Sequence, residues 1–216
     1  MTGPISPSLA DALISRFRSH ADLDLALHEC TSIELAALWH DWEFWARSNQ
    51  LPPEGLAWRS WGALTGRGWG KTRAFSEFVN REAAAGRAMR IALMAQTETK
   101  AWEVLIEGES GLLATSPPWF KARVFNGRVI WPNGAQAFVY TPESPGGVFG
   151  PEHHLGWASE IHYWPKSTRE EAFRNLRLGL RLGYGRLVWD SNPRRGHPII
   201  RFLLERGERD PVRHVV

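Results

Sequence analysis

The sequence contains almost no cysteine and no long apolar run. Its single cysteine, Cys30, excludes an internal disulfide and any metal site built from a cluster of cysteines. No stretch approaches the roughly 20 consecutive apolar residues that span a bilayer, and the first residues lack the basic start and apolar core of a secretion signal. We therefore expect a protein of a reducing cytoplasm that makes no membrane contact.

Acidic residues are slightly outnumbered by basic ones, which gives a formal net charge of +3. Most of the basic residues are arginine, whose guanidinium fork suits phosphate recognition. This balance permits a nucleotide or nucleic-acid partner without proving one. With 216 residues, of which 43% are hydrophobic, the chain is long enough to bury one large core.

The chain has two parts with different patterns. Residues 1–50 repeat apolar positions at helical spacing and predict a helical segment, which Pro52, Pro53 and Gly55 end. Residues 51–216 alternate short apolar runs with helical patterns, which predicts an α/β domain. The final residues, 211–216, have the pattern of a strand that is only beginning. We therefore expect that a longer natural chain was cut here.

The alternation predicts a mainly parallel sheet flanked by helices, with an inserted β-meander. Within residues 121–141, the turn pairs Asn126-Gly127 and Asn133-Gly134 separate three β-rich pieces, at 122–125, 128–131 and 135–140. The remaining strands are expected at 58–65, 90–95, 155–159 and 186–190, and the helices at 72–85, 99–106, 167–182 and 198–206.

The stretch GRGWGKT, residues 66–72, lies between an expected strand and an expected helix. Glycines free the backbone N–H groups to surround a phosphate, a lysine reaches the β and γ phosphates, and a hydroxyl binds Mg²⁺. The Walker A spacing G-x-x-x-x-G-K-[ST] departs only at its first position, where Thr65 precedes a glycine. We predict a nucleotide-phosphate site with contacts from Gly66, Arg67, Gly68, Trp69, Gly70, Lys71, Thr72 and Arg73. The alternative is a plain turn with a solvated lysine.

Hydrolysis also needs a carboxylate that orients or deprotonates water, usually at the end of a neighbouring strand. Glu160 ends the apolar run 155–159 and is the expected base, although it has the alternative of being an ordinary exposed acid. Ser159 stands where an aspartate near Mg²⁺ is expected, and we assign it, with Thr72, to the metal. Asp190, one strand away, is a partial replacement for the missing acid.

Arg67 within the loop has a second expected role, and two residues upstream of the loop are further candidates for nucleotide contacts. Arg67 is expected to stabilise the transferring phosphate, or alternatively to hold the loop by pairing with an acid. Trp58 and Arg59 lie just upstream and are candidates for stacking on and flanking a purine base, although a tryptophan at a strand start is more often part of the core.

The order of several motifs resembles the N-terminal ATPase domain of the large terminase subunit of tailed phages, and of related prophage and gene-transfer-agent packaging proteins. The resemblance covers about residues 38–205. Its landmarks are WEFWAR (42–47), QLPP (50–53), GRGWGKT (66–72), IEGESGLL (106–113), SPPW (116–119), WPNGA (131–135), GPE (150–152) and LRLGLR (176–181). This ordered set disfavours a helicase or a small kinase.

The resemblance implies an additional-strand P-loop NTPase fold and ATP hydrolysis with Mg²⁺ that drives double-stranded DNA into a prohead. It further implies a homo-oligomeric ring, a pentamer in the family, on the portal protein, with a small terminase subunit as partner. The location would be the bacterial host cytoplasm and, transiently, the prohead portal. The family's carboxy-terminal nuclease domain has no counterpart within residues 51–216, so we expect no DNA cutting by this chain.

Three positions depart from the family pattern. The acid pair of the catalytic strand becomes Ser159-Glu160, and the threonine-rich coupling motif becomes DSNP at 190–193, where Ser191 or Asn192 is left to sense the γ-phosphate. The third is Phe149, where relatives often carry an arginine. The departures affect expected turnover more than nucleotide binding. They motivate an alternative function: a nucleotide-responsive assembly or DNA-binding subunit with weak or no ATP turnover.

Overall fold

The computed structural model describes residues 10, 15 and 19–216, and the chain divides into two compact units, Met1–Pro52 and Pro53–Val216. The described part of the first unit is helical, as the sequence predicts. The remainder of the predicted helical pattern, residues 1–9, 11–14 and 16–18, lies outside the described residues. The elements of this unit are α2 (His20–His28), α3 (Ser32–Trp39), α4 (Trp42–Trp45) and the 3-10 turn η1 (Ser48–Gln50).

The second unit is built on one eight-stranded sheet with the order β3-β4-β5-β2-β6-β7-β1-β8. The expectation of a mainly parallel sheet is corrected: the sheet is mixed, because β3–β4 and β4–β5 pair antiparallel while the other neighbours pair in parallel. The strands are β1 (Ser60–Leu64), β2 (Arg90–Met94), β3 (Arg123–Phe125), β4 (Arg128–Ile130), β5 (Gln136–Tyr140), β6 (Leu155–Ala158), β7 (Arg186–Ser191) and β8 (His214–Val215).

The predicted meander forms, but it extends the main sheet and is not a separate insert. Asn126 and Gly127 both have positive φ angles, 48° and 70°, which the tight turn between β3 and β4 requires. Strand β5 then pairs antiparallel with β4 on one side and parallel with β2 on the other. The meander therefore ends inside the sheet, and this is why the sheet is mixed.

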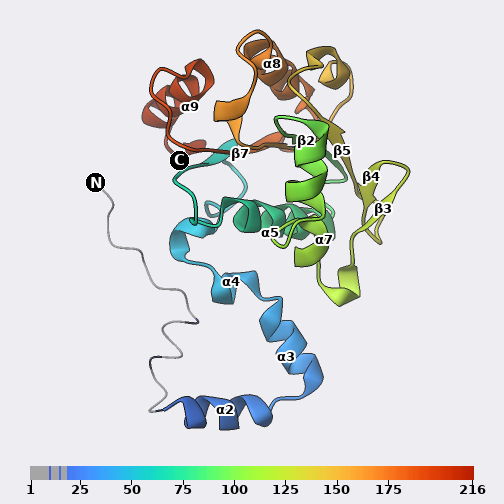
Figure 1. Cartoon of the computed structure of the whole chain (residues 1–216), viewed down its shortest axis with the longest axis vertical. Helices are drawn as coiled ribbons and strands as arrows, with labels where there is room; N and C mark the ends of the chain where they lie inside the picture. Colours follow the sequence, from blue (N-terminus) through green and yellow to red (C-terminus); the bar gives the residue numbers. More distant parts are fainter. Residues whose placement is uncertain (1–9, 11–14, 16–18) are drawn as a thin grey trace. The chain divides into compact units, whose positions relative to one another are not determined.

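Helices cover both faces of the sheet, with α5 and α7 on one face and α8 and α9 on the other (Figure 1). The helix predicted at 99–106 begins as one α-helical turn and continues as a π-helix. The elements are α5 (Lys71–Ala84), α6 (Glu98–Lys100), the π-helix η2 (Ala101–Ile106), α7 (Leu112–Thr115), α8 (Arg169–Gly179) and α9 (Pro198–Arg209), with 3-10 turns η3 (Pro118–Phe120), η4 (Pro145–Val148) and η5 (Ile161–Tyr163).

Aromatic packing fixes helix α5 on the sheet, and therefore fixes the point at which this helix begins. Phe75 and Phe78 are buried and lie 4.8 Å and 5.6 Å from the ring of Trp61 in β1. Phe75 also lies 6.0 Å from Trp157 in β6. These edge-on and tilted contacts join α5 to two strands of the sheet. On the other face Trp189 belongs to the core that α8 and α9 cover.

His153 precedes β6 and is fully buried, with Nε2 placed 3.1 Å from the Tyr140 hydroxyl. Burial first, and then the charges of Arg90 and His154, lower the pKa of His153 from 6.5 to about 4. Between pH 4 and pH 6.5 the unfolded chain binds more protons than the folded chain, so the unfolding free energy falls as pH drops from 6.5 towards 4. Above pH 6.5 the stability that comes from burying a neutral His153 is fully present.

We predict that His153→Gln reduces this pH dependence by about 2 kcal/mol between neutral pH and roughly pH 4.5. Urea unfolding of both proteins at the two pH values measures it. The difference between the proteins isolates His153, because the other histidines are common to both. Parallel stability curves for the two proteins would contradict the prediction.

Among the helices of the described chain, none combines the length and the apolar character that a membrane crossing requires.

Candidate functional site

The carboxyl ends of three adjacent parallel strands bring the expected site residues together. Strand β7 lies between β6 and β1, so the segments that follow these strands meet at one edge of the sheet. The glycine-rich loop, residues 66–70, follows β1, Glu160 follows β6, and Asn192 follows β7. Open α/β sheets bind ligands at this edge.

The glycine-rich loop leads into α5 through two residues that require glycine. Gly68 and Gly70 have φ angles of 82° and 88°, which side-chain-bearing residues rarely adopt. Helix α5 begins at once with Lys71. It has no side-chain N-cap and no acidic residue in its first turn. The positive end of a 14-residue helix therefore opens towards the loop without a carboxylate from its own first turn to neutralise it.

A cavity of about 500 Å³ lies over this helix start. One wall consists of the loop and the first turn of α5, and Glu160 contributes a carboxylate from β6. The opposite wall comes from η2 and the segment that follows it. The lining residues are 66–73, Glu103, Val104, 108–110 and Glu160.

Lys71 is 7% exposed, and its ammonium group joins the loop to the ends of β6 and β7. Nζ donates hydrogen bonds to the backbone oxygens of Thr65 and Gly66, at 3.0 Å and 3.3 Å, and to Oδ1 of Asn192 at 2.8 Å. It also lies 3.8 Å from Oε1 of Glu160. The lysine thus stands at the centre of the predicted residues.

Glu160 extends from the end of β6 in a backbone conformation that is unusual for glutamate, with φ 49°. Its side chain is 37% exposed, and its second oxygen, Oε2, lies 3.2 Å from Nε2 of His162. The backbone N–H of Glu160 donates to Oδ1 of Asp190 at 3.0 Å. This hydrogen bond holds the strained residue in place, so that its carboxylate faces the cavity and Lys71.

Asp190 is buried beside the two residues that replace the expected acid pair. Its Oδ1 accepts from the Ser159 hydroxyl at 3.4 Å, and its Oδ2 accepts from Nε1 of Trp157 at 2.9 Å. Burial raises the pKa of Asp190 to about 6, and the hydrogen bonds from Trp157 and Glu160 oppose that rise. A buried carboxylate on the adjacent strand is thus in hydrogen-bond contact with Ser159.

His162 links the end of β6 to the end of β7. Its Nδ1 lies 3.1 Å from the Ser191 hydroxyl, and its Nε2 lies 3.2 Å from Nδ2 of Asn192. Burial lowers the pKa of His162; Glu160 raises it, while Lys71, Arg194 and Arg67 lower it. Asp190 and Asn192 thus contact Glu160 and Lys71 directly, and Ser191 contacts His162, which lies beside Glu160.

The remaining loop residues line the same cavity. Arg67 is exposed, and no ion pair joins it to an acid in the part of the chain that the structure describes, so the alternative of a loop-holding pair finds no support. Thr72 and Trp69 are half-buried in the wall. Arg73 also lines the cavity, where its Nε donates to Oε1 of Glu77 at 2.7 Å.

Trp58 and Arg59 are not brought together with the loop. They precede β1, whereas the loop follows it, and the five residues of β1 separate the two ends by about 13 Å. Trp58 is 2% exposed and stacks against the guanidinium of Arg186, 4.7 Å away. Trp58 is therefore a core residue and not a base-stacking residue, which is the alternative given for a tryptophan at the start of a strand.

Several residues of the site have no local signature in the sequence. Glu103, Glu109 and Ser110 line the cavity from η2 and the following segment, and His162, outside the lining, lies beside Glu160 in the turn after it. The sequence marked the part of the cavity formed by η2 and the following segment only through the landmark at 106–113, and this landmark indicated no chemical role. His162 follows the expected base by two residues, a spacing that predicts proximity once the turn after β6 is known.

Hard oxygen ligands suit Mg²⁺, and amide donors with a lysine suit phosphate. The Thr72 hydroxyl and the Glu160 carboxylate line the cavity, and the uncapped start of α5 adjoins Lys71. Ser159 and Asp190 are buried and do not line it, but Asp190 accepts hydrogen bonds from the Ser159 hydroxyl and the Glu160 backbone. The residues present therefore fit a nucleotide phosphate chain with its magnesium ion. Within the described residues no group of three or more His, Cys, Asp or Glu side chains forms a metal site of its own.

Known proteins resemble this chain in sequence pattern and in fold. A family model described as "Terminase large subunit, T4likevirus-type, N-terminal" matches residues 63–209. The large terminase ATPase domain of Thermus phage P74-26 has 18% identity and a TM-score of 0.54, over 70% of this chain and 66% of that one. A mutant of that domain has 17% identity and a TM-score of 0.53, over 71% of this chain and 70% of that one. No curated protein matches the chain.

A large terminase from a thermophilic bacteriophage has 14% identity and a TM-score of 0.47. The similarity covers 73% of this chain but only 38% of that protein.

Proposed function

The chain belongs to the T4likevirus-type terminase large subunit family, in its N-terminal part, and we propose that it is an ATPase motor domain that drives double-stranded DNA into a viral prohead. The observation that carries the proposal is one cavity in which Lys71 of the glycine-rich loop lies 3.8 Å from Glu160 of another strand. A phosphate-binding cation and a base candidate thus face the same space, as phosphoryl transfer to water requires.

In this proposal the domain is a P-loop NTPase of the additional-strand type. Strand β7 separates β1, which carries the glycine-rich loop, from β6, which carries Glu160, and so has the position of the additional strand. The loop's backbone N–H groups and the start of α5 bind the phosphates together with Lys71. The adenine base has no assigned contact from Trp58 or Arg59, because both lie at the other end of β1.

Hydrolysis would depend on three side chains. Glu160 would accept or orient the proton of the attacking water, since its carboxylate faces the cavity. Arg67, exposed at the rim, would stabilise charge on the transferred phosphate. Thr72 and Ser159 would hold the magnesium ion, with Asp190 behind them; when bound, the ion would neutralise charge on the phosphate oxygens. Asn192, which accepts a hydrogen bond from Lys71, is the candidate γ-phosphate sensor.

The partners of such a motor follow from the same proposal. They are double-stranded DNA, a portal protein, a small terminase subunit and further copies of the chain in a ring on the prohead, within the host cytoplasm. DNA contacts would go mainly to phosphates through arginine, and would weaken as salt increases.

Asp190 is a positioning residue in this scheme, because it acts through Glu160. Asp190 accepts hydrogen bonds from both Trp157 and the Glu160 backbone. In Asp190→Asn the side-chain NH₂ must face one of these two donors, so one of the two hydrogen bonds is lost. We expect kcat for ATP hydrolysis to fall about tenfold or more, while KM changes much less. Steady-state kinetics measure the split. A rise in KM with kcat unchanged would assign Asp190 to nucleotide binding instead.

The proposal is tested by calorimetry with ATP or ADP and Mg²⁺, followed by steady-state ATPase assays with and without double-stranded DNA and portal protein. Saturable binding together with turnover that DNA stimulates supports the motor. Binding without turnover supports the second candidate, a nucleotide-responsive assembly or DNA-binding subunit, which the serine at position 159 favours. Absence of any nucleotide binding by folded protein overturns both.

A further inference from the structure

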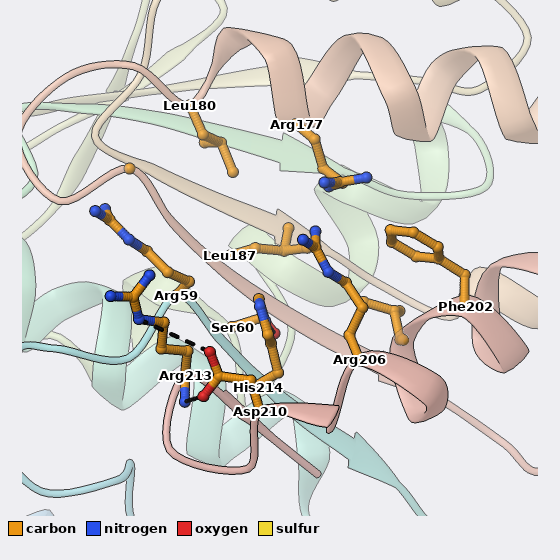
Figure 2. Close-up of a pocket in the computed structure, with 12 residues that line it drawn as sticks. Arg59, Ser60, Arg177, Leu180, Leu187, Phe202, Arg206, Asp210, Arg213 and His214 are labelled. Carbon is orange, nitrogen blue, oxygen red and sulfur yellow. Dashed lines mark hydrogen bonds and ion pairs between the residues drawn. The ribbon is translucent and has the colours of Figure 1, made fainter. Parts of the chain in front are cut away.

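A second cavity, of about 290 Å³, lies at the opposite edge of the sheet from the glycine-rich loop. It is formed where Arg59 leads into β1, where α8 ends and where α9 leads into β8. Leu187 and Leu203 form an apolar floor. Figure 2 shows the charged side chains that surround this floor.

The cavity collects far more positive than negative charge. Its charged and titratable lining residues are Arg59, Arg177, Arg206, Arg213, His214 and Asp210. The lone acid is already engaged, because Asp210 accepts from the backbone N–H of Arg213 at 3.1 Å and lies 3.8 Å from its Nε (dashed in Figure 2). Arg59 donates to the backbone oxygen of Tyr184.

Arg177 and Arg206 face each other from α8 and α9 across this space (Figure 2). Both guanidinium groups lie over the ring of Phe202, at 4.8 Å and 5.3 Å from its centre. Neither forms an ion pair with any acid among the residues that the structure describes. Two like charges therefore share one aromatic ring with no carboxylate between them, an arrangement that an anion would stabilise.

The neighbouring titratable groups respond to this positive field. Burial and then Arg206 lower the pKa of Arg177. Burial also lowers the pKa of His214; Arg206, Arg177 and Arg213 act in the same direction, and only Asp210 opposes them. His214 keeps a hydrogen bond with the Ser60 hydroxyl, at 2.8 Å, which fixes its ring beside the cavity.

We propose that this cavity is a phosphate-binding site, in which the guanidinium groups of Arg177 and Arg206 bind the phosphate oxygens and Arg59 contributes a third guanidinium group. A tetrahedral phosphate presents its oxygens in several directions, and so suits guanidinium forks from different elements better than a planar carboxylate does. The site is independent of the ATP site, which lies across the sheet. The phosphate comes either from the backbone of double-stranded DNA or from a free phosphate ion.

The test titrates inorganic phosphate into the full chain while the imidazole NMR signal of His214, assigned with His214→Gln, reports on this cavity alone. We expect a saturable shift in the wild-type protein and a rise in the pKa of His214 on binding. Arg206→Gln should weaken binding about tenfold or more. Arg209→Gln, which removes the same charge from α9 outside the cavity, should leave binding within about twofold.

Arg206→Lys keeps the charge but loses the fork, so an intermediate affinity is expected. Arg177→Gln gives the same test if the Arg206 variant does not fold. A second titration uses short double-stranded DNA at several salt concentrations. Weaker DNA binding by Arg206→Gln, with the salt slope reduced by about 0.9, identifies a DNA phosphate as the ligand.

Unchanged DNA binding together with weaker phosphate binding identifies a free phosphate. A wild-type His214 signal that does not respond to phosphate, or equal weakening by the Arg206 and Arg209 variants, overturns the proposal.

Discussion

Glu160→Gln is expected to lower kcat for ATP hydrolysis by about 10²- to 10⁴-fold, the range typical for removal of a general base. Glutamine has nearly the same shape and keeps the backbone hydrogen bond to Asp190, but its amide cannot take a proton. The ion pair with Lys71 is lost, and the lysine keeps its three hydrogen bonds to the loop and to Asn192. Nucleotide affinity should therefore remain within a few-fold of wild type.

Steady-state ATPase assays and calorimetry with ATP and Mg²⁺ measure the two quantities separately. The matched control is Glu109→Gln, which removes a carboxylate from the same cavity without touching Lys71. This control should retain turnover within about threefold of wild type. If Glu160→Gln hydrolyses ATP at the wild-type rate, the base lies elsewhere and the role given to Glu160 is wrong.

The glycine-rich loop could be predicted from sequence because its chemistry is contiguous. Residues 66–72 supply the glycines, the lysine and the hydroxyl within one turn between a strand and a helix, and the structure has that strand and that helix. Glu160 could be placed at a strand end for the same reason. The alternation of apolar runs likewise located all of β1, β2, β6 and β7 within a few residues.

The rest depends on contacts between distant segments. The proximity of Asp190 to Glu160 requires β7 to lie next to β6, and the wall carrying Glu103 requires the π-helix to pass over the loop. Neither fact is encoded in a local pattern. Trp58 and Arg59 illustrate the reverse case: they are close to the loop in sequence, yet an extended strand carries them to the other edge of the sheet.

Sheet direction was mispredicted for a related physical reason. The meander's turn pairs predicted antiparallel neighbours correctly, but they carry no information about the strand that pairs with the inner side of β5. That partner is β2, and the pairing is parallel, so the meander and the α/β core form one mixed sheet.

Lys71→Met is expected to weaken ATP binding by about 100-fold, which corresponds to about 2.7 kcal/mol, because it replaces the ammonium group with an uncharged, unbranched side chain one atom shorter. The effect has two sources. The ammonium no longer meets the phosphates, and it no longer holds Asn192 and the backbone oxygens of Thr65 and Gly66 around the loop. Calorimetry with ATP and Mg²⁺ measures the loss, with circular dichroism confirming that the variant is folded.

Lys100→Met is the matched control, since it removes a lysine charge from an exposed pair with Glu103 outside the loop, and its ATP affinity should stay within about threefold of wild type. The ADP affinity of Lys71→Met adds a second comparison. If Lys71 contacts both the β and γ phosphates, its removal should weaken the protein's affinity for ATP more than its affinity for ADP. If Lys71 only holds the loop in place, its removal should weaken the two affinities equally. Wild-type affinity for both nucleotides would mean that the phosphates bind elsewhere, and the motor proposal would then lose the cavity on which it is built.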